Sequence, residues 1–501
     1  MRFADRHYRD EWLPNYYPSR SLGQHRVRIS RTGKTQILTA EEDAQLDEIF
    51  MDPTLFGRLQ RTGHILTEQN AQRVLADLKT WHLKTYMGPY LHIVVLTRRC
   101  NLNCTYCHMN PVAVGHPEAQ ADLQPDVAEA VIRFAFSSPS PYIKFEFQGG
   151  EPFLNFAGMR HFVQRAQRYN EEVGKQLSFT VVSNLMVATD QQLEFCRDNH
   201  ISVAYTLNGP QDIHDYFRSS RNGRGSYERV VRRMREVNER FPGLLSSGPL
   251  CVVTQDNAAE LRRMIDFYHD AGFPSLAIIA LKHLGNAVTN RLMFDVREFL
   301  HYYLAALDYI YDKNRELKEA YSERSMRVVL AKIFGASDVG YVDWRNPCGD
   351  VSGALTYDYD GEILPSDEAR SLRHVFGLGN VRDLSYEQLM RRKSTFMTMN
   401  LSLRDRDPIC RECPYNPYCG VSPVLDYGRT RDASPRPHES DECLFTIAVL
   451  DWAFRKLMED PLPLMRMLPD FDAHAWELLP EPTGQPAESL ALGGASRGGG
   501  P

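Results

Sequence analysis

The stretch that decides the fold is RRCNLNCTYCHMN, residues 98–110, which follows the apolar run of residues 91–96. Its cysteines stand in a C-x3-C-x2-C spacing at Cys100, Cys104 and Cys107. Three thiolates are one fewer than a closed four-ligand metal site requires, so a [4Fe–4S] cluster held here would leave one iron open to a ligand. Half of a zinc site is the alternative. That site needs a second Cys or His pair soon afterwards, and the next cysteine is Cys196.

This stretch resembles the signature of the radical S-adenosylmethionine (SAM) enzymes, with Tyr106 at the aromatic position before the third cysteine. The resemblance implies that S-adenosylmethionine chelates the open iron through its amino and carboxylate groups. Electron transfer through the cluster then releases a 5′-deoxyadenosyl radical. This chemistry belongs to the cofactor, and the protein supplies position and exclusion of water.

Composition narrows the class of protein. The 501-residue chain is 43% hydrophobic with a net charge of −6, which gives no basic field for nucleic acid. No apolar stretch approaches the roughly 18 residues of a membrane helix, and the charged start MRFADRHYRDEW lacks a signal peptide. Ten cysteines in clustered spacings fit metal binding in a reducing compartment. We therefore expect a cytoplasmic protein that binds neither nucleic acid nor membrane.

Short apolar runs alternate with amphipathic helices from residue 88 to 335, as in repeated βα units. The expected strands are residues 91–96, 143–147, 179–182, 201–207, 250–254 and 276–281. The family resemblance implies an α/β fold, a partial (β/α)6 radical SAM barrel. Site residues should then lie at the carboxyl ends of its strands. After it we expect a SPASM-type domain over 336–450, a C-terminal helix over 451–480 and a disordered tail over 481–501.

Residues 1–87 read as a separate module. A hairpin is predicted at residues 27–29 and 35–38, and Thr39 with Glu42 makes a capping box for a helix that carries Leu46, Ile49 and Phe50 on one face. The layout is similar to the winged-helix modules that bind leader peptides. Five bases and no acids lie between positions 11 and 41, so an acidic leader strand would suit this edge, a solvated basic face being the alternative.

A second motif, Gly149-Gly150-Glu151-Pro152, follows the second expected strand. Adjacent glycines let the backbone approach a ligand closely. The motif resembles the GGEP element of the family, which binds the amino group of S-adenosylmethionine, although alone it is an ordinary turn.

Further cofactor contacts are implied by the same resemblance at Ser183, Asn184, Thr206 and Arg218. The first two end the third strand, where the family contacts the ribose hydroxyls. The others belong to a stretch similar to the family's SLDGP…HD…R pattern, in which Asn208 stands here in place of Asp. Arg218 suits the cofactor carboxylate. Strand-end turns and a solvated arginine are the alternatives.

The C-terminal cysteines resemble those of the SPASM extension, which ligate two auxiliary clusters. Those of the second cluster are present as Cys410, Cys413, Cys419 and Cys443. Two positions of the first are Ser366 and Pro423. We therefore expect one auxiliary [4Fe–4S] cluster, with Cys348 left over. A four-cysteine zinc knot is the alternative.

The run SDEAR at residues 366–370 resembles the maturases of His-Xaa-Ser peptide systems. Asp367 and Glu368 are the candidate proton acceptors, and a solvated acidic turn is the alternative.

The resemblance implies an oxidoreductase that matures a ribosomally made precursor peptide, forming a side-chain crosslink at a β-carbon. Epimerisation, thioether formation and formylglycine formation on a sulfatase are alternatives with the same radical. A zinc-stabilised peptide-binding scaffold is the alternative from another class. The expected partners are the precursor peptide and an electron donor such as flavodoxin or ferredoxin.

Overall fold

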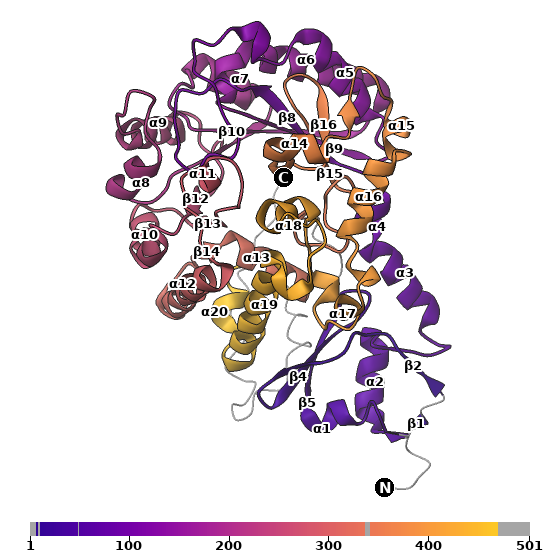
Figure 1. Ribbon diagram of the computed structural model, residues 1–501. Coiled ribbons are helices and arrows are strands. Elements are labelled where there is room, and N and C mark those ends of the chain that lie inside the picture. Colours follow the sequence, from indigo (N-terminus) through magenta and orange to yellow (C-terminus); the bar gives the residue numbers. More distant parts are fainter. Residues whose placement is uncertain (1–6, 9–10, 49, 336–340, 469–501) are drawn as a thin grey trace, which may run out of the picture.

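The computed structural model describes residues 7–8, 11–48, 50–335 and 341–468 (Figure 1). At its centre lies a seven-stranded sheet in the order β11-β10-β9-β8-β15-β16-β17. The parallel part consists of β8 (Leu91–Thr97), β9 (Tyr142–Gly149), β10 (Gln176–Ser183), β11 (Ile201–Tyr205) and β15 (Ala354–Tyr357). The first four expected strands are thus confirmed, and they pair in chain order.

The last two expected strands are also present, in a three-stranded parallel sheet of β12 (Leu250–Val253), β13 (Ser275–Ala280) and β14 (Ser322–Glu323). A single parallel bridge, Thr206 to Leu250, joins the end of β11 to the start of β12. The run of parallel strands therefore continues from one sheet to the other.

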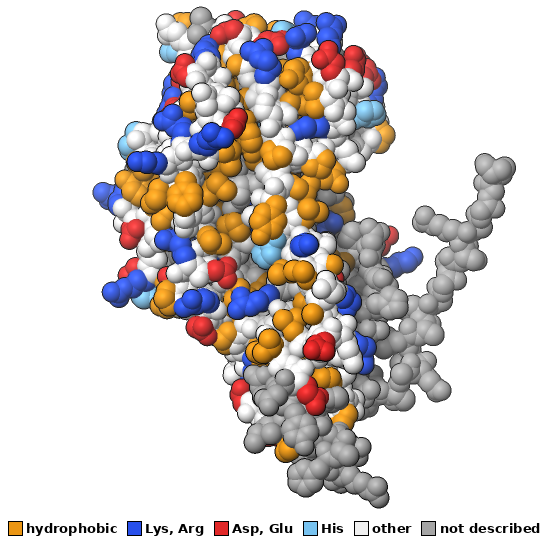
Figure 2. Space-filling model, turned by 90° about the vertical axis from the view of Figure 1, so that its right-hand side faces the viewer, with side chains coloured by type: hydrophobic (Ala, Val, Ile, Leu, Met, Phe, Trp, Pro, Cys, Tyr) orange, Lys and Arg blue, Asp and Glu red, His pale blue; other side chains and the backbone are white. Residues whose placement is uncertain are grey.

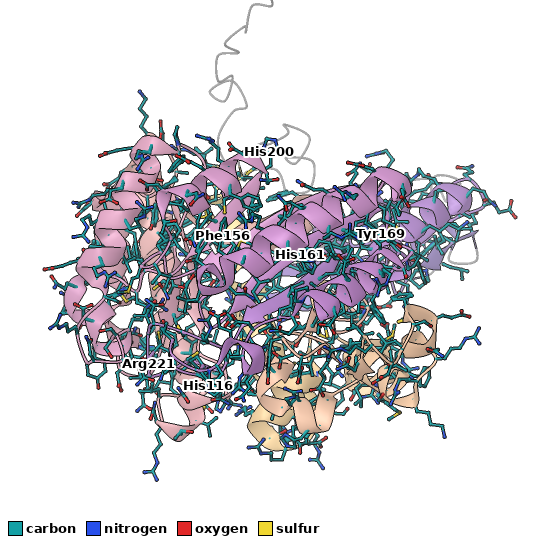
Figure 3. The ribbon with its side chains drawn as sticks, turned by 90° about the horizontal axis from the view of Figure 1, so that it is seen from above. His116, Phe156, His161, Tyr169, His200 and Arg221 are labelled. Carbon is teal, nitrogen blue, oxygen red and sulfur yellow. The ribbon has the colours of Figure 1, made fainter. Side chains whose placement is uncertain are left out.

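Helices cover the outer face of the sheets (Figure 1). They are α5 (Pro125–Phe136), α6 (Phe156–Val173), α7 (Asp190–Asp198), α8 (Gln211–Phe217), α9 (Tyr227–Arg240), α10 (Leu261–Asp270), α12 (Val296–Glu316) and α13 (Arg324–Phe334). The short helix α11 (Asn286–Thr289) lies instead against the cysteine stretch, where Asn286 N donates to Cys107 O at 3.0 Å. Seen from above, α6 runs along the sheet, with Phe156, His161 and Tyr169 marking its length (Figure 3).

Alternation along β9 sets the two faces of the sheet. Phe145 and Phe147 are fully buried, and both pack edge-to-face on Phe162 of α6, with ring centroids 4.9 and 5.4 Å apart. Such pairs contribute about 0.5–1.5 kcal/mol beyond the burial of their area. Glu146 and Gln148 point the other way and line the central cavity. The apolar set holds the helix, which leaves the polar set free for a site.

The C-terminal region completes the central sheet. β15 pairs parallel with the free side of β8, and β16 (Glu362–Leu364) and β17 (Gly379–Asn380) extend the sheet antiparallel. The helices that follow are α14 (Arg373–Phe376), α15 (Tyr386–Met390), α16 (Lys393–Ser402), α17 (Pro408–Arg411), α18 (Pro423–Thr430), α19 (Asp441–Glu459) and α20 (Leu462–Met465). α19 crosses the boundary expected at residue 450, and the expected tail over 481–501 lies outside the described residues.

The N-terminal module has the predicted hairpin, β4 (His25–Ile29) and β5 (Thr35–Thr39), with β3 (Arg20–Leu22) on the outer side of β4. Its other elements are β1 (His7–Tyr8), β2 (Leu13–Pro14), α1 (Ala40–Ala44), β6 (Phe50–Met51), α2 (Pro53–Thr62), β7 (Ile65–Leu66), α3 (Ala71–Trp81) and α4 (Leu83–Tyr86).

The capping box of this module is confirmed, since Thr39 and Glu42 exchange both of its hydrogen bonds. The expected helical face was wrong. α1 ends at Ala44, so Leu46 follows the helix and Phe50 lies in β6, whereas Ile49 lies outside the described residues. Leu46 and Phe50 thus both lie in a segment that turns after the helix, and their apolar character alone did not predict this.

One face of the molecule carries an apolar band across its middle, with charged side chains above and below it (Figure 2). Large exposed apolar side chains in the described part of the chain include Tyr86 of α4 and Phe396 of α16. No helix in this part is both long enough and apolar enough to cross a bilayer.

Candidate active site

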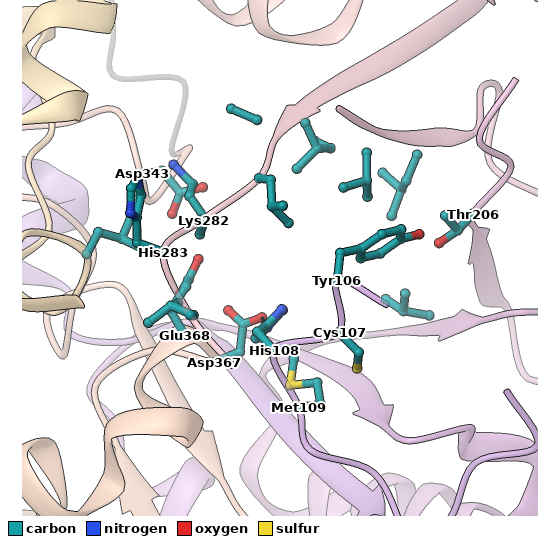
Figure 4. A pocket seen from close by; sticks show the side chains of 18 of the residues that line it. Tyr106, Cys107, His108, Met109, Thr206, Lys282, His283, Asp343, Asp367 and Glu368 are labelled. Carbon is teal, nitrogen blue, oxygen red and sulfur yellow. Dashed lines mark ion pairs between the residues drawn. The ribbon is translucent and has the colours of Figure 1, made fainter. Parts of the chain in front are cut away.

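The parallel strands end at one cavity of about 530 Å³. Its volume lies in the usual range of small-molecule sites, about 300–1,000 Å³. The cavity is lined from one side by the cysteine stretch and by the ends of β9, β10 and β11, and from the other by residues of the C-terminal region. Figure 4 shows this cavity from close by.

The cysteine stretch is held at the cavity by the loops around it. Cys100 N donates to Val112 O at 2.9 Å, and Arg221 Nε donates to Cys100 O at 3.1 Å. Arg221 stands at the same end of the molecule as His116 (Figure 3). The stretch starts from a buried pair, in which Arg99 donates to both oxygens of Asp122 at 2.8 and 2.6 Å.

The three sequence-predicted sulfurs border the cavity, at Cys100, Cys104 and Cys107. Burial raises the pKa of Cys100 to about 12 and that of Cys107 to about 11. These thiols therefore keep their protons until a metal binds and displaces them. Three thiolates that face open space fit a cluster with one free iron.

The two glycines after β9 are required by the protein itself. A Cβ on Gly149 would lie 2.3 Å from Thr97 O, and one on Gly150 would lie 2.3 Å from Arg99 O. The predicted reason, room for a ligand, was incomplete. These positions also let the end of β9 pack on the chain that leads into Cys100.

Glu151 is buried and accepts three hydrogen bonds. The donors are Phe153 N at 3.2 Å, Ser183 Oγ at 2.9 Å and Asn184 N at 2.8 Å. Burial raises its pKa, and these donors oppose the shift. Glu151 and Pro152 are absent from the described lining of the cavity, whereas Gly149, Gly150, Ser183 and Asn184 belong to it. The carboxylate thus holds the ends of β9 and β10 together.

Arg218 meets the cysteine stretch at Tyr106. Its Nη1 donates to Tyr106 Oη at 2.8 Å, and Asn208 Nδ2 donates to the same oxygen at 3.0 Å. Arg218 Nε has no hydrogen-bond partner in the described part of the chain. Both Arg218 and Thr206 line the cavity. The predicted contacts are thus brought together, and Asn208 is a further partner that no sequence motif predicted.

Residues 94–268 match the sequence model of the Radical SAM superfamily. The chain is a radical SAM enzyme. Its cofactors are a [4Fe–4S] cluster and S-adenosyl-L-methionine, and the cysteines and strand ends described above are the residues that fit them. The enzyme is 22% identical over 329 residues to the cysteine-type anaerobic sulfatase-maturating enzyme of Clostridium perfringens, a match that covers 64% of this chain and 84% of that protein.

Other relatives agree with this assignment. The serine-type anaerobic sulfatase-maturating enzyme of Bacteroides thetaiotaomicron is 26% identical over 136 residues, 26% of this chain and 32% of its own. A solved structure of anSMEcpe with bound AdoMet and Cp18Cys peptide superposes with a TM-score of 0.61 at 18% identity. It covers 74% of this chain and 98% of that one, which supports the shared fold.

The two predicted proton acceptors of the radical SAM enzyme, Asp367 and Glu368, both line the cavity. Burial opposes ionisation of Asp367, but the nearby His108, with its Nε2 3.8 Å from Asp367 Oδ2, leaves the pKa of this carboxyl below the usual range. Burial and the neighbouring Asp367 charge raise the pKa of Glu368 well above its ordinary value. Lys282 was not predicted, because it lies in a loop that no motif marks. Its Nζ lies 3.3 Å from Glu442 Oε1.

The C-terminal thiols of the enzyme gather around the start of α19. Cys419 has its pKa raised well above normal by burial and by the charges of Cys443, Cys413 and Cys410. Cys348 lies apart, 1% exposed, on the wall of the central cavity. Among the described residues, no three His, Cys, Asp or Glu side chains converge as ligands of one metal ion. A cubane cluster spreads its thiolates over four irons and holds them farther apart.

Proposed function

We propose that this radical SAM enzyme modifies a ribosomally made precursor peptide and forms a crosslink at a β-carbon, as the resemblance to His-Xaa-Ser maturases implies. The observation that carries the proposal is the shape of the cavity, which passes from the cysteine stretch to Asp367 and Glu368. This leaves space beyond the cofactor for a side chain of a longer substrate. The sulfatase-maturating relatives, which by their names act on proteins, support a polypeptide substrate.

Each part of the cavity has a task in this proposal. Cys100, Cys104 and Cys107 hold the radical SAM cluster, and S-adenosylmethionine contacts the backbone of Gly149 and Gly150 and the polar ends of the next strands. Arg218 pairs with its carboxylate, since its Nε has no hydrogen-bond partner among the described residues. Tyr106 and Asn208 orient that arginine, and Glu151 orients Ser183 and Asn184.

Bound S-adenosylmethionine supplies the 5′-deoxyadenosyl radical that takes one hydrogen atom from the substrate, and an auxiliary cluster supplies an acceptor for the second electron. Four cysteines would hold that cluster: Cys410, Cys413, Cys419 and Cys443. Glu368, once ionised, suits the acceptor of the proton that leaves the second side chain, because its raised pKa makes its carboxylate the stronger base. Asp367, with its lowered pKa, is the weaker base.

The N-terminal module is proposed to hold the leader peptide on its sheet of β3, β4 and β5. Several of its bases are already paired. Arg20 contacts Asp451, Arg28 lies 2.5 Å from Asp43, and Lys34 lies 2.7 Å from Asp77. Backbone pairing at a sheet edge therefore contributes more to leader binding than charge does. A cytoplasmic flavodoxin or ferredoxin is the proposed electron donor.

Anaerobic reconstitution tests the function. The protein is given iron, sulfide, dithionite, S-adenosylmethionine and a precursor peptide rich in His-Xaa-Ser repeats. Formation of 5′-deoxyadenosine together with loss of two hydrogens from the peptide is the expected result. An unchanged peptide mass with incorporated solvent deuterium would instead establish epimerisation. A colourless protein that holds zinc and forms no 5′-deoxyadenosine would refute both.

Formylglycine formation is the second candidate, because the sulfatase-maturating enzyme of Clostridium perfringens matches 64% of this chain. A sulfatase-derived peptide with cysteine or serine at the modified position would gain an aldehyde, which a hydrazide reagent traps. Aldehyde formation without any crosslink in the precursor peptide would favour this candidate.

A further inference from the structure

The far end of the central cavity is walled by carboxylates. Lys282, His283 and Asp343 lie at one end of the view in Figure 4, Thr206 and Tyr106 at the other, and His108 between them. Five acids that line this end are here called the acidic chamber: Asp343, Asp350, Asp367, Glu368 and Asp426. They come from four separate parts of the C-terminal region.

The chamber acids form no close ion pair with a lysine or arginine in the described part of the chain. The two other acids on the same wall have partners, since Glu442 lies 3.3 Å from Lys282 and Asp441 lies 2.7 Å from Arg429. In the described part of the chain, no chamber acid has a Lys or Arg nitrogen within 4.0 Å; Asp367 alone has His108, at 3.8 Å. The wall thus carries more carboxylates than cations.

One buried oxygen of a chamber acid also lacks a hydrogen-bond donor in the described part of the chain. Asp426 is 2% exposed, and its Oδ2 has no donor among the described residues. Asp350 is 6% exposed and accepts one bond, from Ser422 Oγ at 2.7 Å. Burying a carboxylate without a counter-charge or a full set of donors is unfavourable. A buried oxygen without a donor therefore indicates that a bound group supplies the missing donors of the chamber.

The titration of the chamber agrees with this deficit of positive charge. Burial, together with the nearby acids Asp343 and Asp367, raises the pKa of Asp350 to about 7. The pKa of Glu368 is also raised, first by burial and then by Asp367, Asp343 and Asp350. A cation placed among these groups would restore their ionised forms.

Most of the chamber lies away from two of the proposed cofactor contacts. In Figure 4, Tyr106 and Thr206 lie at the opposite end of the view from Asp343, and Asp367 lies between them, beside His108. The two ends nevertheless share one cavity. A group bound in the chamber would therefore belong to the molecule that undergoes the reaction.

We propose that the acidic chamber binds a positively charged side chain, lysine or arginine, of the peptide substrate, and so selects a basic residue close to the residue that is modified. This inference rests on the proposed peptide-modifying function. The chamber offers several oxygens at its wall, which suits an ammonium or guanidinium group with several donors.

Binding without turnover tests the proposal. The reconstituted holoenzyme with S-adenosylmethionine, but without reductant, is titrated calorimetrically at pH 7.5 and about 150 mM salt, where charges beyond about 8 Å are screened. The probes are acetyl-Gly-Ser-Lys-Ser-Gly-amide and the same peptide with norleucine in place of lysine. We expect the lysine peptide to bind about tenfold more tightly, about 1.4 kcal/mol.

Two variants act in opposite directions. Asp343→Asn should remove most of this preference, whereas Lys282→Met removes the competing cation and should increase it. Glu387→Gln is the matched control, because this acid lies on α15 with its side chain 73% exposed, outside the described lining of the cavity. It removes the same unit of charge and should leave the preference unchanged. Iron content and thermal unfolding establish that each variant is folded.

Equal affinity for the two peptides would overturn the proposal, as would an equal loss of preference in Glu387→Gln and Asp343→Asn. Spermidine and Mg²⁺ are titrated as free cations, and tight binding of either one without binding of the lysine peptide would also overturn it. If the lysine peptide binds as expected but no peptide is ever modified, the proposed function fails and the chamber assignment stands.

Discussion

The buried pair of Arg99 and Asp122 gives the sharpest test of how the cysteine stretch is held. Its two hydrogen bonds, at 2.8 and 2.6 Å, join side chains that are 6% and 5% exposed, directly before Cys100. Asp122→Asn would leave the buried guanidinium without its buried counter-charge, with only the exposed Glu118 carboxylate, 3.4 Å from Nη1, as a partner of opposite charge. Breaking a buried pair in this way costs about 3–5 kcal/mol.

An exposed pair of the same type is the control. Arg382 and Asp126 lie 2.8 Å apart, with side chains 44% and 66% exposed, so Asp126→Asn should cost about 0–1 kcal/mol. For a domain of about 150–250 residues, 1 kcal/mol corresponds to about 2–4 °C in Tm, so Asp122→Asn should lower the Tm of the domain that contains the cysteine stretch by roughly 6–20 °C. Thermal unfolding followed by circular dichroism measures both, and iron bound after reconstitution should fall only in Asp122→Asn.

The reasoning would be refuted if the two variants lost the same stability. It would also be refuted if Asp122→Asn unfolded at the wild-type temperature, since the pair would then not support the stretch before Cys100.

Three further predictions concern other sites. Gly150→Ala places a Cβ 2.3 Å from Arg99 O and should cost about 1–3 kcal/mol of stability, with loss of bound iron. Gly115→Ala, whose Cβ would meet nothing within 4 Å, should change neither the stability nor the iron content, and equal effects of the two variants would contradict the packing role. Burial lowers the pKa of His92 to about 3, so the unfolded state binds its proton first and stability is lost as pH falls from about 6.5 towards 3. His92→Gln should therefore reduce the slope of the unfolding free energy against pH by up to about 1.4 kcal/mol per pH unit. An unchanged slope in urea titrations at several pH values would contradict this. Cys419→Ala should remove about four irons, one cubane, while Cys251→Ala, at a fully buried thiol in β12, should keep them all; iron and sulfide analysis decides.

Local patterns carried much of the fold. The six expected strands are present because buried parallel strands are continuous apolar runs, and β9 shows the expected alternation. The cysteine stretch, Ser183, Asn184 and Arg218 were predicted at one site, and the cavity brings them together. These signals are local: each depends on spacing within one segment, or on the rule that parallel strands end at one edge.

Contacts between distant segments were not predictable. β15 pairs with β8, which lies far away in the sequence, and no property of residues 354–357 predicts this pairing. Glu151 was expected to contact the cofactor, whereas its hydrogen bonds go to Ser183 and Asn184, thirty or so residues on. The acidic chamber draws on four separated segments, so its excess of charge has no signature in any one of them.

The place of β15 also has a consequence for biosynthesis. The chain makes β8 early, but the neighbour on its open side is translated only after the whole run of βα units. Until then the nascent protein presents a bare, apolar strand edge, the kind of surface to which other extended chains add. Closure of the sheet is therefore a late event during synthesis. Until then, chaperones or rapid translation must keep this edge from pairing with other chains.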